Sequence, residues 1–261
     1  MNNKDPRIPG GKIKEERRYF DTDLLETVES VFDRATVSTV LQLIRSKCIK
    51  NLKGVVSSGK EARVYWGVDY ENRDVAVKIY YTLTSEFKKS IWKYLAGDPR
   101  FEEYRGMNWK KLIYMWTSKE YNNLSRMYKA EVRVPKPICK KNNVLVMEFI
   151  GSNGTRAPLL KEAYNDGALD TASLEKIYED VIEQLRRIVL RARLVHADLS
   201  EYNIMIHNNT PYIIDVSQAL PINHPSAHDF LRRDIENISR FFKEAGVEIM
   251  DPEDLFKELI E

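Results

Sequence analysis

The sequence has few of the features that mark secreted, membrane-spanning or strongly nucleic-acid-binding proteins. Its 2 cysteines, Cys48 and Cys139, lie far apart in apolar surroundings, so we expect two small buried side chains in a reducing compartment rather than a disulfide. No apolar run approaches the roughly eighteen residues that a membrane span needs, and the first residues contain no apolar segment typical of a secretory signal. The formal net charge is only +2, which gives no overall attraction to nucleic acid. We therefore expect a soluble cytoplasmic protein with no membrane or DNA partner.

What the sequence does contain is enough apolar material for a core. The hydrophobic content is 43% of 261 residues, which suits one large domain or two small lobes. Residues 1–20 are polar and rich in proline and glycine, which predicts a mobile tail. Apolar residues then recur at helical spacing around Leu24 to Phe32 and from Val37 to Ile44, with Thr36 placed to cap the second run. We expect two short helices in residues 21–50 that pack on the lobe that follows.

A glycine-containing stretch at residues 54–67, GVVSSGKEARVYWG, resembles the start of a Walker A phosphate loop. A Walker loop requires Ser or Thr after its lysine and leads from a strand into a helix. Here Glu61 follows Lys60, and the residues beyond it, ARVYWGV, have the β-branched and aromatic composition of a strand. A turn and a second strand, VAVKIYY, come next. The stretch therefore predicts a loop between two strands of a hairpin, and a Walker-type NTPase receives little support.

The remaining chain changes from strands to helices near residue 150. A helix is predicted from about Ser118 to Lys129, then two strands around a turn at residues 141–143. Later segments predict a long amphipathic helix from Leu174 to Val189, a strand–turn–strand unit within residues 194–219, a helix at about 226–244 and a last helix from Pro252. This order predicts an α+β protein with a small N-terminal β-rich lobe and a larger α-helical C-terminal lobe.

Three stretches carry residues capable of phosphate chemistry. Lys78 stands in the apolar strand VAVKIY, where an edge lysine facing solvent is the plainer interpretation; the nearby glycine loop makes an anion site the alternative. VHADLSEYN places Asp198 and Asn203 in a pattern that also suits an ordinary turn-rich loop. Asp215, however, follows three apolar residues at a strand end, and a carboxylate there is costly to bury without a cation. Together, Asn203 and Asp215 offer hard oxygen ligands suited to Mg²⁺.

These stretches resemble the protein-kinase pattern of a lysine strand, an H-x-D-x-x-x-x-N loop and a strand-end aspartate. More narrowly, SSGKEA, HADLSEYN and IDVSQA resemble the RIO family of atypical serine/threonine protein kinases, and IDVSQ resembles its RIO-one subgroup. The resemblance covers about residues 24–260. It implies a two-lobed protein-kinase-like fold that is truncated, without an activation segment or peptide-docking helices. The implied domains are a tail at 1–20, helices at 21–50, an N-lobe at 51–148 with a flexible insertion at about 84–116, and a C-lobe at 149–261.

The resemblance also implies roles for individual positions, with ATP and Mg²⁺ (or Mn²⁺) as cofactors. Asp198 would be the catalytic aspartate, Lys78 would contact the phosphates, and Asn203 and Asp215 would hold the metal. Glu120 is the candidate partner of Lys78, and Glu131 is the less favoured alternative because it falls past the helix. The expected nucleotide-binding residues are Val56, Ser57, Ser58, Gly59, Lys60, Val64, Ala76, Lys78, Glu120, Met147, Glu148 and Ile150, where the Glu148 carbonyl and the Ile150 amide would hydrogen-bond adenine.

The expected activity is phosphoryl transfer from ATP, with autophosphorylation, protein phosphorylation or ATP hydrolysis as its outcome. Ala197 and Val216 stand where ordinary kinases carry Arg and Phe, so the usual phosphorylation switch is not expected. The family resemblance further implies a role in small ribosomal subunit maturation, with a subunit precursor, both its protein and its rRNA, as partner. The alternatives are an assembly factor that uses ATP hydrolysis as a switch, and a small-molecule phosphotransferase.

Overall fold

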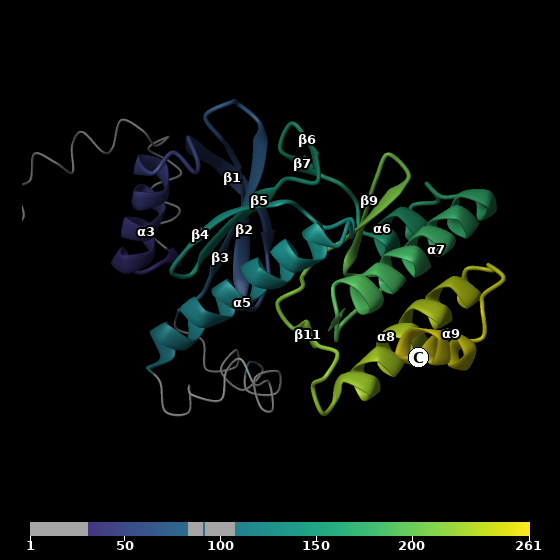
Figure 1. Cartoon of the computed structure of the whole chain (residues 1–261). Coiled ribbons are helices and arrows are strands. Elements are labelled where there is room, and N and C mark those ends of the chain that lie inside the picture. The colour runs from purple at the N-terminus through teal and green to yellow at the C-terminus, as the bar shows by residue number, and fades with distance from the viewer. Residues whose placement is uncertain (1–30, 83–90, 92–107) are drawn as a thin grey trace, which may run out of the picture.

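The computed structural model describes residues 31–82, 91 and 108–261, and in this part of the chain two lobes lie side by side (Figure 1). The N-terminal lobe is a five-stranded antiparallel sheet in the order β1-β2-β3-β5-β4. Its strands are β1 (Asn51–Ser58), β2 (Ala62–Val68), β3 (Asp74–Tyr80), β4 (Pro137–Lys141) and β5 (Val144–Glu148). The strands predicted on either side of the glycine loop and of the turn at residues 141–143 are confirmed.

The central strand β3 serves two faces of the sheet because alternate side chains point in opposite directions. Val75, Val77 and Ile79 pack in a core shared with helix α3 (Arg34–Arg45). Tyr80 belongs to the main core on the opposite face, and Ala76 and Lys78 line the cleft there. Both faces of β3 are therefore in use, which explains its nearly continuous apolar sequence.

Helix α3 begins two residues earlier than its predicted cap. Its N-cap is Asp33, whose carboxylate accepts a hydrogen bond from the Thr36 backbone amide at 2.9 Å. The prediction of Thr36 as the cap was therefore wrong, since an aspartate at the start of the same turn satisfies the free amides. The helix predicted at about residues 24–32 lies almost entirely outside the described residues, as do the tail at 1–20 and residues 84–90 and 92–107 of the predicted insertion.

Helix α5 is longer than predicted. It spans Trp109–Lys129 with Asn108 as its N-cap, so the predicted start near Ser118 and the predicted end of the insertion at residue 116 are both wrong. Its first turns bury Leu112, Ile113 and Trp116 at helical spacing in the main core. The lysines and aromatic residues between them obscured this period in the sequence.

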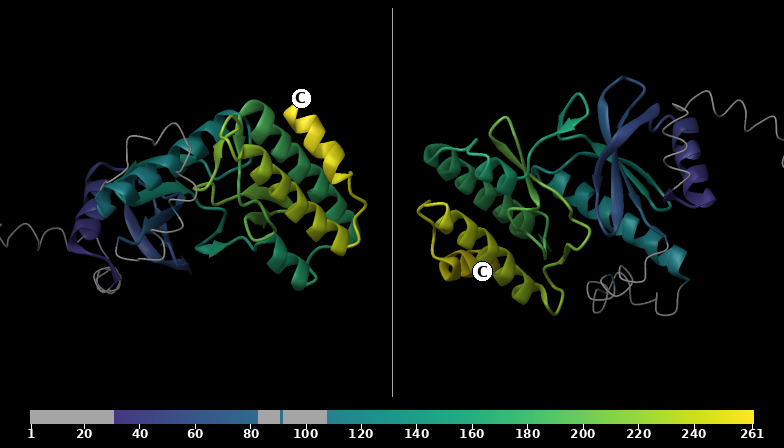
Figure 2. Two further views of the ribbon diagram at one scale, coloured as in Figure 1. Left: turned by 90° about the horizontal axis from the view of Figure 1, so that it is seen from below. Right: turned by 180° about the vertical axis from the view of Figure 1, so that it is seen from behind.

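The C-terminal lobe follows β5 through a short hairpin, β6 (Gly151–Ser152) and β7 (Thr155–Arg156). It contains α6 (Leu160–Asn165), α7 (Thr171–Arg186) with a π-helical continuation (Arg187–Arg191), α8 (Ala227–Glu244) and α9 (Pro252–Ile260). Two small strand pairs, β9 (Ile204–His207) with β10 (Thr210–Ile213) and β8 (Leu194–Val195) with β11 (Leu220–Pro221), lie on the side that faces the sheet. Figure 2 shows the helices gathered on the far side of these strands. The prediction of a small β-rich lobe followed by a helical lobe is confirmed.

The expectation that the two cysteines are unpaired is wrong. Cys48, just before β1, and Cys139, on the edge strand β4, form a disulfide with their Cα atoms 6.5 Å apart. Both side chains pack against the core beneath α3. The sequence separation of 91 residues concealed this contact, because it arises only when β4 closes the sheet beside the α3–β1 connection. Within the described residues, no helix combines the length and apolarity needed to cross a bilayer.

Candidate active site

A cavity of about 450 Å³ lies between the lobes. The glycine loop and strands β2 and β3 cover it, α5 closes one end, and the segment after β5 closes the other. The strand pair β9–β10 and the residues after it form the opposite wall. The cavity therefore draws its lining from segments that are up to about 160 residues apart, from Val56 to Gln218.

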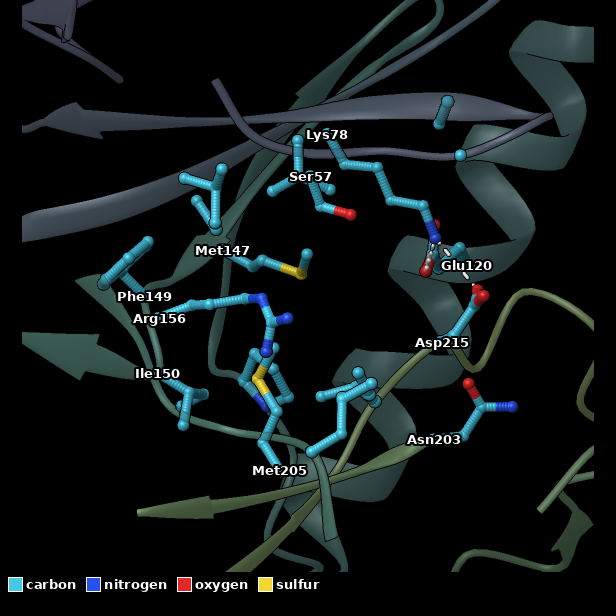
Figure 3. A pocket seen from close by; sticks show the side chains of 18 of the residues that line it. Ser57, Lys78, Glu120, Met147, Phe149, Ile150, Arg156, Asn203, Met205 and Asp215 are labelled. Carbon is cyan, nitrogen blue, oxygen red and sulfur yellow. Dashed lines mark hydrogen bonds and ion pairs between the residues drawn. The ribbon is translucent and has the colours of Figure 1, made fainter. Parts of the chain in front are cut away.

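Lys78 is the centre of the charged end of this cavity. Its Nζ atom lies 2.8 Å from Glu120 Oε1 and 2.9 Å from Asp215 Oδ1 (Figure 3). Burial lowers the pKa of Lys78, but the carboxylates of Asp215 and Glu120 outweigh that effect and hold the pKa well above its ordinary value. An ammonium that stays charged is thus fixed between the sheet, α5 and the loop after β10.

The Glu120 carboxylate has a second hydrogen-bond partner besides Lys78. Its side chain is only 2% exposed, and the Tyr80 hydroxyl donates a hydrogen bond to its second carboxylate oxygen. Asp215, by contrast, leaves 45% of its side chain exposed in the cleft. Burial by itself raises the pKa of Asp215, and the Lys78 ammonium more than reverses this, so the pKa lies below its ordinary value. The buried carboxylate positions the lysine, while the exposed one remains accessible to a ligand.

The neighbours of Glu120 on α5 fix the loop that follows Asp215. The Lys119 ammonium, 1% exposed, donates to the carbonyl oxygens of Ser217 at 2.7 Å and Ala219 at 2.6 Å. Asn123 donates to the carbonyls of Val216 and Ala219, both at 2.9 Å. One helix therefore controls two parts of the site, the lysine through Glu120 and the Asp215 loop through Lys119 and Asn123.

The loop between β8 and β9 is anchored from beneath by a buried carboxylate. Asp234 on α8 accepts hydrogen bonds from the Ala197 and Leu199 amides, both at 2.8 Å, on either side of Asp198. Burial raises the pKa of Asp234 to about 7, although the two amide donors oppose that shift. His196 is fully buried and its Nε2 lies 3.0 Å from the Ile214 carbonyl oxygen. The backbone around Asp198 is thus held on both sides.

Asn203 lies on the side of this loop that faces the cavity. Its amide nitrogen donates to the Asp198 carbonyl oxygen at 2.7 Å, which turns its side-chain oxygen toward Asp215 (Figure 3). One amide oxygen and one partly exposed carboxylate therefore converge beside Lys78. Mg²⁺ prefers such oxygen donors and commonly completes its shell with water and phosphate oxygens. The pair fits a magnesium ion that is shared with a phosphate ligand.

The opposite end of the cavity is mostly apolar. Met147 lines it from β5, Phe149 and Ile150 from the segment that joins the lobes, and Met205 from β9. Within the described part of the chain, the Ile150 amide donates no backbone hydrogen bond, whereas its carbonyl accepts one from the Ala157 amide at 2.9 Å. An apolar slot with a free backbone donor at its edge suits a flat, partly polar ring.

Most of the residues that the sequence singled out line this one cavity. They are Val56, Ser57, Gly59, Lys60, Val64, Ala76, Lys78, Glu120, Met147, Glu148, Ile150, Asn203 and Asp215. Ser58 does not line it: its hydroxyl accepts a hydrogen bond from Arg63 and lies 3.4 Å from the Tyr81 hydroxyl. Asp198 is not part of the lining either; its backbone and carboxylate oxygens accept hydrogen bonds from the Asn203 side chain at 2.7 and 3.3 Å. Glu131 pairs with Arg191, away from the cavity.

Sequence reasoning missed several lining residues. Leu159, Met205 and Ile214 are apolar, and nothing in the sequence separates them from core residues. Arg156 was also missed. It sits in the hairpin after the lobe junction, SNGTRAP, where an arginine suggests only an exposed turn.

The described chain has two lobes with a cleft between them. Lys78 on β3 pairs with Glu120 on α5 and with Asp215, which follows β10. This arrangement is that of a protein-kinase-like fold. Residues 63–255 match the model of the RIO domain, and the chain belongs to the RIO1 family of serine/threonine protein kinases. It is 42% identical over 231 residues to the RIO-type serine/threonine-protein kinase Rio1 of Haloferax volcanii, covering 88% of this chain and 77% of the relative.

Other relatives are longer than this chain. The serine/threonine-protein kinase RIO1 of Caenorhabditis elegans is 38% identical over 95% of this chain and 48% of its own length. The human RIO1 kinase is 38% identical over 94% of this chain and 44% of its own length. The chain thus spans about half of these two relatives. A crystal structure of the Rio2 kinase–ADP/Mg²⁺–phosphoaspartate complex from Chaetomium thermophilum shares the fold, with a TM-score of 0.64 at 20% identity over 85% of this chain and 65% of the other.

Proposed function

We propose that this protein is an ATP-dependent serine/threonine protein kinase of the RIO type that binds its nucleotide with Mg²⁺ in the cleft. The observation that carries this proposal is the joint pairing of Lys78 with Glu120 and Asp215 at 2.8 and 2.9 Å. Kinases need both the lysine–glutamate pair and the metal-binding aspartate in place at the same time. This pairing is in place in the described chain.

In this proposal the apolar end of the cleft takes adenine, with the Glu148 carbonyl and the Ile150 amide at its edge. The glycine loop, with Ser57, Gly59 and Lys60, covers the phosphates, and Lys78 binds their oxygens. Asn203 and Asp215 hold Mg²⁺, which neutralises the charge that builds on the phosphate oxygens. Because the transition state is loose, positioning and charge neutralisation supply most of the rate.

Asp198 has two possible roles in the transfer. It could orient a substrate hydroxyl and accept its proton as the new O–P bond forms and the bond to ADP breaks. Alternatively, its own carboxylate oxygen could attack the γ-phosphorus, giving an aspartyl phosphate that water later hydrolyses. The second role gains support from the matched Rio2 complex, which is described as containing phosphoaspartate.

One assay separates these outcomes. Purified protein is incubated with labelled ATP and Mg²⁺, and phosphate is measured on the protein itself, on an added serine-rich protein, and in solution. Phosphate on added protein supports a kinase, and release to water alone supports an ATPase. Lys78→Met serves as the control, because loss of the phosphate-binding cation should remove all three signals. If the wild-type protein shows none of them, the proposal is wrong.

We further propose action in small ribosomal subunit maturation in the cytoplasm, which the family resemblance supports. Co-sedimentation of the protein with small-subunit precursors across a salt series tests it, because contacts to rRNA weaken steeply as salt rises.

A further inference from the structure

The apolar end of the cavity contains a charged side chain that the family pattern did not predict. Arg156, on β7, lines the cavity, and Figure 3 shows its guanidinium extending inward between Met147 and Met205. Among the described lining residues, the other basic side chains are Lys60 and Lys78, which belong to the glycine loop and the charged end. Arg156 is thus the cation of the apolar end.

The guanidinium is held in this position before any ligand arrives. Its two terminal nitrogens donate to the two carboxylate oxygens of Glu162, each at 2.7 Å, and one of them also donates to the Ala157 carbonyl at 3.1 Å. Glu162 lies in the first turn of α6 and accepts a further hydrogen bond from the Leu159 amide at 2.9 Å. Such a bidentate pair fixes the plane of the guanidinium, which lowers the entropic cost of using it in binding.

Arg156 differs from two other arginines of the described chain in its contacts with aromatic rings. Elsewhere in the described chain, Arg232 lies 3.7 Å from the centre of the Phe256 ring and Arg233 lies 4.8 Å from that of Phe230. In the described part of the chain no aromatic ring stacks on Arg156. Glu162 already accepts the amide hydrogen of Leu159, the N-cap residue of α6. The start of this helix therefore does not require an arginine that lines the cavity.

We propose that Arg156 is a nucleotide-binding residue whose guanidinium packs against the purine base, and that Glu162 positions it for that contact. The inference rests on the proposed nucleotide site and assigns the recognition of the base to this side chain. A flat, delocalised cation attracts the π face of an aromatic ring, and Arg156 lines the same end of the cavity as the apolar Met147, Ile150 and Met205.

The test measures ADP binding by isothermal titration calorimetry in the presence of Mg²⁺. We expect Arg156→Ala to weaken ADP binding by about tenfold, the size of a partly desolvated cation–π contact. Arg156→Met, which keeps the apolar stem, should lose nearly as much, and Glu162→Gln less. Inorganic tripolyphosphate, which has no base, should bind the wild-type protein and Arg156→Ala equally well.

The chain offers a matched control. Arg186 forms a similar bidentate pair with Glu258. The side chains of Arg186 and Glu258 are 31% and 40% exposed, compared with 30% and 41% for Arg156 and Glu162. Arg186→Ala should leave ADP binding unchanged. Equal ADP affinity in the wild-type, Arg156→Ala and Arg156→Met proteins would overturn the inference alone, as would tighter binding by the variants. A wild-type protein that binds no ADP would overturn the proposed nucleotide site as well.

Discussion

The two ends of the cleft are built in different ways. At the charged end, Lys78, Glu120 and Asp215 come from three segments, and Lys78 contacts both carboxylates directly. Buried side chains from α5 and α8 hold the backbone of the loops beside them. At the apolar end, the lining comes largely from one stretch after β5, and its charged pair is partly exposed. At the charged end, the loss of one side chain should affect the side chains and loops that it contacts. At the apolar end, each contact should be independent of the others. Each prediction below tests that difference.

Removing the exposed carboxylate should have the largest effect. Asp215→Asn keeps the shape of the side chain but removes its charge, so we expect ATP turnover to fall by about a thousandfold or more. The fold should survive, because 45% of the Asp215 side chain is exposed. Turnover assays with a Mg²⁺ titration, alongside thermal unfolding, check this. Normal turnover by a folded variant would rule out Asp215 as a metal ligand.

The buried lysine on α5 should come next. Lys119→Met removes the donor to two carbonyls in the Asp215 loop, so we expect turnover to fall by about ten- to a hundredfold, mainly in kcat, because a displaced metal-binding loop impairs positioning. The Ser217 carbonyl loses its donor, whereas the Ala219 carbonyl keeps Asn123, so the variant should also lose about 1–3 kcal/mol in the free energy of unfolding.

Lys140→Met is the control for that variant. Lys140 donates from the exposed surface to Ser118, the residue before Lys119 on α5, at 2.8 Å. Its loss should change neither turnover nor stability by a measurable amount. If Lys119→Met loses stability but keeps the wild-type kcat, the lysine is structural and α5 does not position the loop.

The pH dependence of stability should report Asp234. Its pKa is about 7 in the folded protein, above the ordinary 3.8, so the folded state binds the proton more tightly than the unfolded state. Its contribution to stability is therefore complete below about pH 4 and is lost as pH rises through about 7. At about 1.4 kcal/mol per unit of pKa, the loss is on the order of 4 kcal/mol.

Denaturant unfolding of the wild-type protein and Asp234→Asn between pH 4 and 8 measures this contribution. The difference in unfolding free energy between the two proteins should change over this range, with the wild-type protein losing more as pH rises. A constant difference would mean that the two amide donors keep Asp234 ionised throughout.

The same contrast explains what the sequence could predict. Lys78 and Asp215 stand out because a charged residue in or beside an apolar strand is costly to bury unless it has a partner, whereas Asp198 and Asn203 stand out through the kinase-like H-x-D-x-x-x-x-N pattern. The apolar end of the cavity gave no such signal, because residues such as Met205 and Ile214 stand in apolar segments that are equally typical of a core strand. The start of α5 and the Cys48–Cys139 contact were missed for a related reason: both depend on which segments meet in space.

The smallest effect is expected from the charged pair of the apolar end. The Arg156 guanidinium and the Leu159 amide lower the pKa of Glu162 to about 2, so the pair adds stability above about pH 4.5 that is lost as pH falls from there toward 2. Because 41% of the Glu162 side chain is exposed, solvent screening limits the gain to about 1 kcal/mol or less. Glu162→Gln should therefore match the wild-type protein at pH 2 and be slightly less stable at pH 6, as Glu258→Gln should be. A loss of several kcal/mol at pH 6 from Glu162→Gln alone would show that this end of the cleft is also a coupled network.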